Sequence, residues 1–229
     1  MFSHLPSLII YVRHPQCAHN LGPAEYTRLV QSGEANKVSP LTDRGLMQTV
    51  YTSEYLKRVF GKFDLTFASD FTRTHAIPQE LGSDFVIDPR IGERWHGQLH
   101  IRGGRFFEDF PEERGRWEAD YYNYRAPDGE SCPEVEARIS DFLSDKNLFA
   151  DARLMLISSH GISGLCFRKV LLQASVEDWH AWHQSRADRL GNASVTVYKR
   201  LPDDKYKIIL YNHLPWKDYL EEEAEGVEA

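Results

Sequence analysis

Short runs of apolar and β-branched residues alternate along this chain with longer stretches of helical character. The runs "SLIIYV" (7–12), "DLTFAS" (64–69) and "ARLMLISS" (152–159) predict strands, and "GISGLCFRKVLLQA" (161–174) predicts the helix behind the last of them. Such an alternation is typical of a sheet covered by helices, and it argues against a helix bundle or a β-sandwich. The sequence therefore predicts an α/β fold.

Another helix is predicted over residues 41–60, ending at Gly61. Its apolar side chains Leu46, Leu56 and Val59 recur, together with two tyrosines, at roughly three-to-four-residue spacing. That spacing places them on one face of a helix, and an amphipathic helix packs its apolar face against the core.

The predicted elements follow one another without a repeat or a low-complexity linker, so one domain over residues 1–220 is the economical interpretation. Residues 96–133 differ from the rest: they are rich in Gly, Arg, Glu and aromatic residues and lack clear periodicity. We expect them to form an insertion over one face. The closing segment 221–229, "EEEAEGVEA", is expected to be an acidic, disordered tail.

The composition of the chain limits its possible binding partners and cellular compartment. The chain has 229 residues, 41% of them hydrophobic, and a net charge of −7, which does not suit nucleic-acid binding because such proteins usually present a basic face. No apolar run approaches the ~18 residues of a membrane span. Cys17, Cys132 and Cys166 form no CxxC pair and no disulfide framework. We therefore expect a cytoplasmic protein that binds neither nucleic acid nor membrane, and the sequence predicts no oligomeric state.

Polar side chains follow several of the predicted strands. Arg13 and His14 end the first, His160 ends the central one, and Arg73 lies in the first turn of the helix after "DLTFAS". Ligands of open α/β sheets bind beyond the carboxyl ends of strands, and a helix N-terminus favours an anion. These side chains are therefore expected to form a cationic cup around His14.

Such a cup suits phosphoryl transfer, in which catalysis consists mostly of positioning and of neutralising charge on three oxygens. A neutral imidazole at His14 can attack phosphorus and become phosphohistidine, and arginine forks match the phosphate oxygens. The leaving alkoxide needs a proton. Glu93, just past an extended segment, is the best-placed acid, and it would act as a base on water in the second half-reaction. The acids Glu108, Asp109, Glu112 and Glu113 of the insertion compete for that role.

The motifs "VRHPQCAHN", "SPLTDRGLMQ", "ASDFTRT", "GERWHG", "PDGESCPEVEARISDF" and "SSHG" occur in this order along the chain. In order and content they resemble those of the histidine phosphatase superfamily, the phosphoglycerate mutase-like proteins, over most of the chain. The resemblance implies a three-layer α/β/α sandwich with a mostly parallel central sheet. It also implies a small phosphorylated substrate and neither metal nor cofactor.

The resemblance also implies roles for single residues. It makes His14 the phosphorylated nucleophile, Arg13, Arg73 and His160 the phosphate clamp, and Glu93 the proton donor. Asn20 matches an asparagine that helps to bind phosphate. Cys17 stands where the family usually has Ser or Thr, and Gly161, which follows His160, joins Asn20 and Cys17 as a substrate-binding candidate.

Two residues depart from the family pattern. Pro15 replaces the glycine that usually follows the nucleophilic histidine, so φ is fixed near −65° and an N–H is lost. We expect the change to be tolerated, because proline biases His14 towards the extended conformation that a strand end already adopts. Cys17 replaces a good hydrogen-bond donor with a weak one.

Three functions stay open at this point. The first is a metal-independent phosphatase of small phosphate monoesters. The second is a phosphoglycerate-type mutase, for which Arg102, Arg105, Arg114 and Arg116 of the insertion offer a basic pocket. The third is a non-catalytic phospholigand-binding module in which Pro15 has disabled turnover.

Two histidine pairs resemble metal motifs. "HAWH" (180–183) lacks a carboxylate or cysteine companion, and "HGQLH" (96–100) is interrupted by a glycine. We expect both pairs to be structural.

Overall fold

The computed structural model describes residues 4–22, 36–102, 105–149 and 152–219. Within these ranges six strands form one sheet in the order β3-β2-β4-β1-β5-β6. The strands β3, β2, β4 and β1 are parallel, whereas β5 and β6 each pair antiparallel with the preceding neighbour. Their bounds are β1 (Leu8–Arg13), β2 (Leu65–Ala68), β3 (Val86–Ile87), β4 (Leu154–Ser159), β5 (Val195–Arg200) and β6 (Tyr206–His213).

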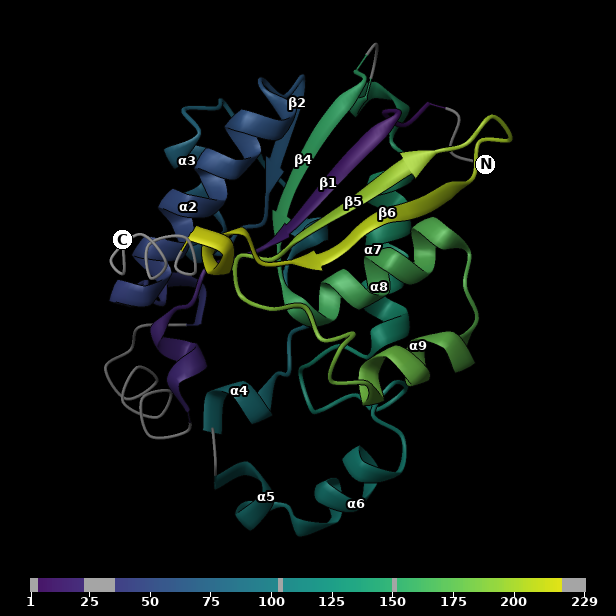
Figure 1. Ribbon diagram of the computed structural model, residues 1–229. Helices are drawn as coiled ribbons and strands as arrows, with labels where there is room; N and C mark the ends of the chain where they lie inside the picture. Colours follow the sequence, from purple (N-terminus) through teal and green to yellow (C-terminus); the bar gives the residue numbers. More distant parts are fainter. Residues whose placement is uncertain (1–3, 23–35, 103–104, 150–151, 220–229) are drawn as a thin grey trace.

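Helices cover both faces of this sheet (Figure 1). The described α-helices are α2 (Asp43–Phe60), α3 (Ala76–Glu80), α4 (Gln98–Arg102), α5 (Phe106–Asp109), α6 (Pro111–Ala119), α7 (Cys132–Ser144), α8 (Gly161–Leu172) and α9 (Val176–Gln184). Short 3-10 helices are η1 (Ala18–Leu21), η2 (Asn36–Val38), η3 (Thr72–Thr74), η4 (Pro89–Ile91) and η6 (Lys146–Leu148).

The buried strands point alternate side chains into two hydrophobic clusters. Ile9 and Tyr11 of β1 belong to the cluster beneath α7, α8 and α9, whereas Ile10 and Val12 belong to the cluster beneath α2 and α3. Because β1 is buried on both faces, it reads as a continuous apolar run rather than an alternating one. The expected three-layer α/β/α arrangement with a mostly parallel sheet is confirmed.

The helix α2 forms where it was predicted, but its buried face was predicted incorrectly in part. Leu46 and Val59 are 56% and 50% exposed. The residues that α2 buries include Gln48 and Thr52, besides the expected Leu56. The buried Gln48 side chain makes a polar contact rather than an apolar one. Its Oε1 accepts a hydrogen bond from the Gln16 amide, in the loop after β1, at 2.8 Å.

The described residues of the insertion form the helices α4, α5 and α6, although the sequence showed no periodicity there. They have a small core of their own around Phe106, Tyr124 and Ala126. Figure 1 shows these helices together, beyond the end of the sheet towards which β1 and β4 run. The insertion is therefore placed next to the strand ends that carry the predicted site. The expected tail, residues 221–229, lies outside the described residues.

No helix in the described part of the chain is long and apolar enough to cross a membrane. Cys17, Cys132 and Cys166 are all buried and free, as expected for a chain without a disulfide framework.

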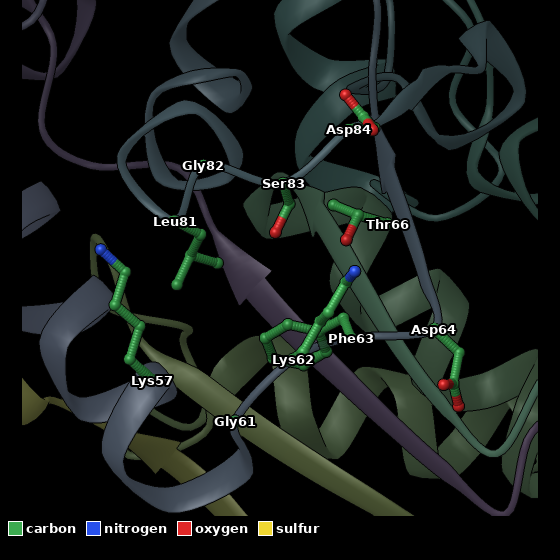
Figure 2. Close-up of a pocket in the computed structure, with 10 residues that line it drawn as sticks. All are labelled: Lys57, Gly61, Lys62, Phe63, Asp64, Thr66, Leu81, Gly82, Ser83 and Asp84. Atoms are coloured by element: carbon green, nitrogen blue, oxygen red, sulfur yellow. The ribbon is translucent and has the colours of Figure 1, made fainter.

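A cavity of about 550 Å³ lies at the amino end of β2 (Figure 2). Lys57, Lys62 and Asp64 line it together with the turn after α3. It contains none of the residues predicted for the site, which follow the opposite, carboxyl end of the strands.

Gly45, in the first turn of α2, allows the helix to approach the loop after β1. A Cβ atom at this position would lie 1.9 Å from the Gln16 carbonyl oxygen. The same contact is secured by Thr42, whose amide donates to that carbonyl at 3.2 Å and whose hydroxyl caps the helix by accepting from Gly45 N. The start of α2 therefore supports the segment that follows His14.

We predict that Gly45→Ala lowers the free energy of unfolding by about 1–3 kcal/mol, because the added methyl displaces the Gln16 backbone. Activity should fall as well, since that backbone is continuous with His14. Gly115→Ala in α6 is the matched control: its Cβ meets nothing within 4 Å, so stability should be unchanged or slightly raised. Urea unfolding of both variants measures the difference, and equal stabilities would contradict the prediction.

Candidate active site

The carboxyl ends of two adjacent strands bring the predicted histidines together. β1 pairs in parallel with β4, with Arg13 opposite Ser159, so His14 and His160 follow neighbouring strands at the same edge. The His14 amide donates to the Ser159 carbonyl at 2.8 Å, which extends the ladder by one residue. The two imidazole rings lie 5.2 Å apart between centroids, and both are buried.

The proton on His14 is fixed by the next residue. His14 Nδ1 lies 2.7 Å from the Pro15 carbonyl oxygen, and a carbonyl can only accept, so Nδ1 carries the hydrogen. The lone pair of the neutral ring is therefore on Nε2. An imidazole that attacks phosphorus needs this arrangement. It depends on the carbonyl of Pro15 and not on a backbone N–H at residue 15, which proline lacks.

The charge state of His14 also suits attack. Burial holds the pKa of His14 well below its ordinary value of 6.5, and the cations Arg73 and Arg13 lower it further. The ring is consequently neutral at neutral pH.

The two arginines predicted to clamp the phosphate reach the cup from a buried position, Arg73, and a partly buried one, Arg13. Arg73 is 2% exposed, and its guanidinium lies over the Phe71 ring at 4.5 Å. Arg13 is anchored by its Nη1, which donates to the Leu190 carbonyl at 2.5 Å, while its buried Nε has no hydrogen-bond partner. Burial lowers the pKa of each guanidinium from its ordinary value. An anion entering the cup would supply the negative charge that these desolvated cations lack.

Ser69, which the sequence marks only as a candidate helix cap and not as a site residue, fixes the ring of His160. Arg73 Nη2 lies 3.3 Å from His160 Nδ1, and a guanidinium only donates, so the proton of the neutral imidazole is on Nε2. That Nε2–H donates to Ser69 Oγ at 2.7 Å. Ser69 directly follows β2, so the only available signal was its position at a third strand end.

Glu93 lies against the first turn of α8. Its carboxylate accepts hydrogen bonds from the amides of Gly161, Ile162 and Ser163 at 3.0–3.3 Å, and from the Ser163 hydroxyl. The free N–H groups of this helix start are thus occupied by Glu93. Gly161, predicted to bind substrate, donates its amide to Glu93, and its own backbone passes close to the Arg13 side chain.

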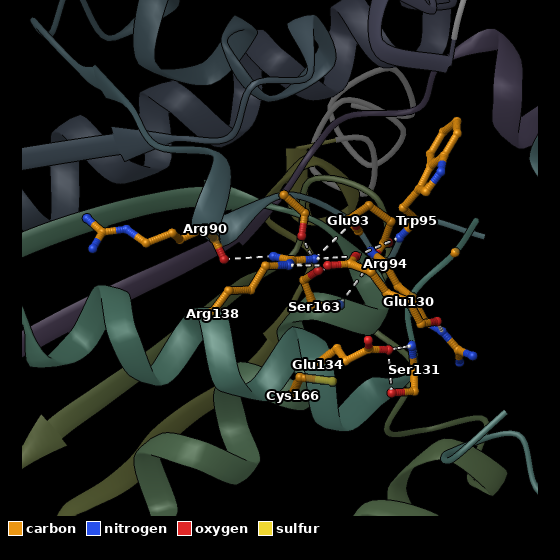
Figure 3. A network of polar contacts seen from close by, with 12 residues as sticks. Arg90, Glu93, Arg94, Trp95, Glu130, Ser131, Glu134, Arg138, Ser163 and Cys166 are labelled. Atoms are coloured by element: carbon orange, nitrogen blue, oxygen red, sulfur yellow. Dashed lines mark hydrogen bonds and ion pairs between the residues drawn. The ribbon is translucent and has the colours of Figure 1, made fainter. Parts of the chain in front are cut away.

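The loop that carries Glu93 is held by Arg138 of α7 (Figure 3). The Arg138 guanidinium donates to the carbonyls of Arg90 and Glu93 at 2.7 and 3.1 Å and forms an ion pair with Glu130. Glu130 in turn accepts from the Trp95 amide at 3.0 Å. The "PDGESCPEVEARISDF" motif therefore acts on the site through the Glu93 loop.

The competing acids of the insertion are engaged elsewhere. Glu113 pairs with Arg116 and accepts from the Tyr124 hydroxyl, and Asp109 pairs with Arg102. Glu108 and Glu112 are exposed on α5 and α6. Glu93 is therefore the acid that the structure places beside Arg13 and the start of α8.

Asn20 and Cys17 lie together on the loop after His14. Asn20 Oδ1 accepts from the Cys17 amide at 3.0 Å, from Cys17 Sγ at 3.4 Å and from Asn192 Nδ2 at 3.2 Å. The amide nitrogen is therefore the end of Asn20 that can reach a ligand. Cys17 is fully buried and orients Asn20.

Two further histidines, His19 and His100, lie near enough to Arg73 for its charge to lower their pKa values. Burial, Arg73 and other nearby charges lower the pKa of His19 to about 4, and burial, His19 and Arg73 lower that of His100 to about 3. Their rings lie 6.2 Å apart, and both are neutral at neutral pH. Both histidines are far from Arg73 in the sequence, so no sequence pattern indicates that they lie near it.

The histidines of "HAWH", which were expected to be structural, lie on α9, where His183 stacks on Tyr121 at 4.4 Å. Within the described ranges, no three His, Cys, Asp or Glu side chains gather as a metal site requires.

The model of the histidine phosphatase superfamily (branch 1) matches residues 9–213. The chain belongs to this superfamily. Its curated relatives include a phosphoglycerate mutase-like protein of Arabidopsis thaliana, AT74, 27% identical over 91% of this chain and 69% of that protein. Another is a probable phosphoglycerate mutase, GpmB, of an Enterobacter species, 30% identical over 69% of this chain and 72% of its relative.

Solved structures show the same superfamily fold. A mycobacterial glucosyl-3-phosphoglycerate phosphatase superposes with a TM-score of 0.68 at 22% identity, covering 90% of this chain and 99% of that one. The α-ribazole phosphatase of Shigella flexneri gives 0.73 at 19% identity, covering 90% and 96%.

The buried histidines predict how stability changes with pH. Folding lowers the pKa values of His14, His160 and His19, so below the ordinary value of 6.5 the unfolded chain binds more protons than the native one. The contribution of these neutral histidines to the free energy of unfolding is therefore complete above pH 6.5 and is lost as the pH falls towards 4. We expect the free energy of unfolding to decrease by on the order of 1 kcal/mol per pH unit for each such histidine.

Urea unfolding between pH 7 and pH 5 measures this slope. His160→Gln removes one of the titrating rings, so its slope should be shallower than that of the native chain. A native profile that stays flat over this range would contradict the prediction.

Proposed function

We propose that this superfamily member is a metal-independent phosphatase that hydrolyses small phosphate monoesters through a phosphohistidine on His14. The observation that carries the proposal is the Nε2 lone pair of a neutral His14, set by the Pro15 carbonyl, beside the buried Arg73 and the partly buried Arg13. We place the reaction in the cytoplasm, with which the three buried free thiols agree.

The reaction balances with the residues of the cup. His14 Nε2 attacks phosphorus, the P–O bond to the alcohol breaks, and Glu93 gives the leaving oxygen a proton. Glu93 then takes a proton from water, whose oxygen attacks the phosphohistidine and breaks the N–P bond. Inorganic phosphate leaves, and His14 is restored. Arg13, Arg73 and His160 would stabilise the charge on the transferred group, with Asn20 and Cys17 at its edge.

The arginines of the insertion favour a phosphatase over a mutase. Arg102 and Arg116 are in ion pairs with Asp109 and Glu113, and Arg114 lies over the Phe107 ring at 5.2 Å. A mutase needs a basic pocket for the substrate carboxylate, and cations already paired with carboxylates make a poor one.

A phosphoglycerate-type mutase is the second candidate, because curated relatives of this chain are named phosphoglycerate mutases. The solved structures with similar folds include named phosphatases. A mutase would retain the phosphoryl group and return it to a bound phosphoglycerate. Interconversion of phosphoglycerates that depends on a bisphosphate primer would identify it.

Replacement of the nucleophile tests the proposal directly. We expect the purified protein to hydrolyse an aryl phosphate without added metal and to form acid-labile phosphohistidine, and His14→Ala to abolish both. His213→Ala, at the end of β6 and outside the cup, is the control and should retain activity. Wild-type protein that binds phosphate but neither turns over any monoester nor becomes phosphorylated would be a binding module instead.

The proton donor can be tested through the leaving group. Glu93→Gln should slow hydrolysis of an alkyl phosphate by roughly 10²-fold or more, but that of an activated aryl phosphate much less, because only a basic alkoxide needs the proton. Glu108→Gln, exposed on α5, is the matched control and should change neither rate. Equal losses on both substrates in Glu93→Gln would assign the proton to another acid.

A further inference from the structure

A cavity of about 430 Å³ lies beside the cup and shares Arg13 and Glu93 with it. Arg13, Glu93 and Gly161 border it on one side. Its other walls come from the segment 117–121 of the insertion, from α8 and from the end of α9 with the loop that follows. The cavity thus touches both a phosphate-clamp arginine and the proposed proton donor.

The position of the proposed proton donor, Glu93, limits which cavity can hold the leaving group. The oxygen that Glu93 protonates must lie within hydrogen-bond reach of its carboxylate, so the alcohol extends into a cavity that Glu93 borders. A second cavity also borders Glu93, but none of Arg13, Arg73 and His160 lines it. Asp70, Asp128 and Glu130 lie in its wall together with Lys37 and Arg138. Lys37 pairs with Asp70 and Arg138 with Glu130, so both of these cations already have a carboxylate partner and neither is left to receive an anionic ester.

The middle of the first cavity is lined by apolar and aromatic side chains. Ile162 and Leu165 of α8 lie next to Leu190, and Trp117 meets Tyr121 edge-on at 4.6 Å. The Tyr121 ring in turn stacks flat on His183. Burial lowers the pKa of His183, with Arg189 adding to the effect, so this ring is uncharged at neutral pH.

Charge is confined to two places around this cavity. Arg13 and Glu93 lie at its inner end, where the phosphate and the leaving oxygen react, and Arg189 is exposed at its rim. Between these two places, the walls consist of aromatic rings and aliphatic side chains. A hydroxyl-rich or carboxylated group bound there would lose its hydration without gaining a charged partner, which costs free energy.

We propose that this cavity binds the leaving group, and that the substrate is a phosphate monoester of an apolar or aromatic alcohol. The inference rests on the proposed function for its orientation of the ester. It names a substrate class that the residues of the cup alone do not select, because those residues contact only the phosphate and the leaving oxygen.

Binding of non-hydrolysable phosphonates tests this class independently of turnover. We expect calorimetry to show that 3-phenylpropylphosphonate binds about tenfold or more tightly than propylphosphonate, because the phenyl ring leaves water for the apolar walls. Ile162→Asn should reduce that ratio severalfold. Ile209→Asn, a like substitution at a 51% exposed position of β6, is the matched control and should preserve it.

Equal affinities, or no binding of either phosphonate, would overturn the proposal. So would tighter binding of 3-phosphonopropionate that is lost in Arg189→Ala, since the rim arginine would then select a carboxylate. A clear preference for the phenyl compound without hydrolysis of any ester would support the cavity and count against the proposed phosphatase alone.

Discussion

The parallel pairing of β1 with β4 is the constraint on which the site depends. Arg13 lies opposite Ser159, and the ladder continues to the His14 amide, so the two histidines leave the sheet side by side. The next strand, β2, pairs with the other edge of β4 and delivers Ser69 to the same place. Backbone hydrogen bonds of a buried sheet therefore set the spacing of the rings, and the loops only add to it. A slip of one residue in this register would point one histidine to the opposite face.

Arg13 and Arg73 have two effects that reinforce each other. They provide the charge that attracts a phosphate, and they help to keep His14 and His160 neutral by lowering their pKa values. Each neutral ring then has one tautomer that satisfies its neighbours: Nδ1–H on His14 towards Pro15, and Nε2–H on His160 towards Ser69. Phosphate affinity and nucleophile readiness are consequently properties of one electrostatic arrangement.

Local signals, namely apolar runs and polar strand ends, predicted β1, β2 and β4 of the six-stranded sheet, the helices α2 and α8, and the polar residues that meet at the cup. Prediction from the sequence failed where the orientation of a side chain depends on a residue that is distant along the chain. Leu46 and Val59 fit the apolar spacing, yet α2 turns Gln48 inward to hold the Gln16 backbone. The contact of Ser69 with His160 joins residues 91 positions apart, and no pattern in either segment reveals it. The three described helices of the insertion are short and pack around their own aromatic core, so no long periodicity could mark them.

Pro15 illustrates why a departure from a family pattern must be judged by the atom that the site uses. Glycine offers an N–H, a free φ and a carbonyl, and proline keeps only the last of these. The His14 ring is oriented by that carbonyl. A fixed φ at residue 15 restricts the backbone that carries the acceptor, so the substitution favours one tautomer and one ring orientation. We infer that Pro15 does not by itself disable the site, and that differences in activity within this fold are better sought in the walls beyond Glu93 than beside the nucleophile.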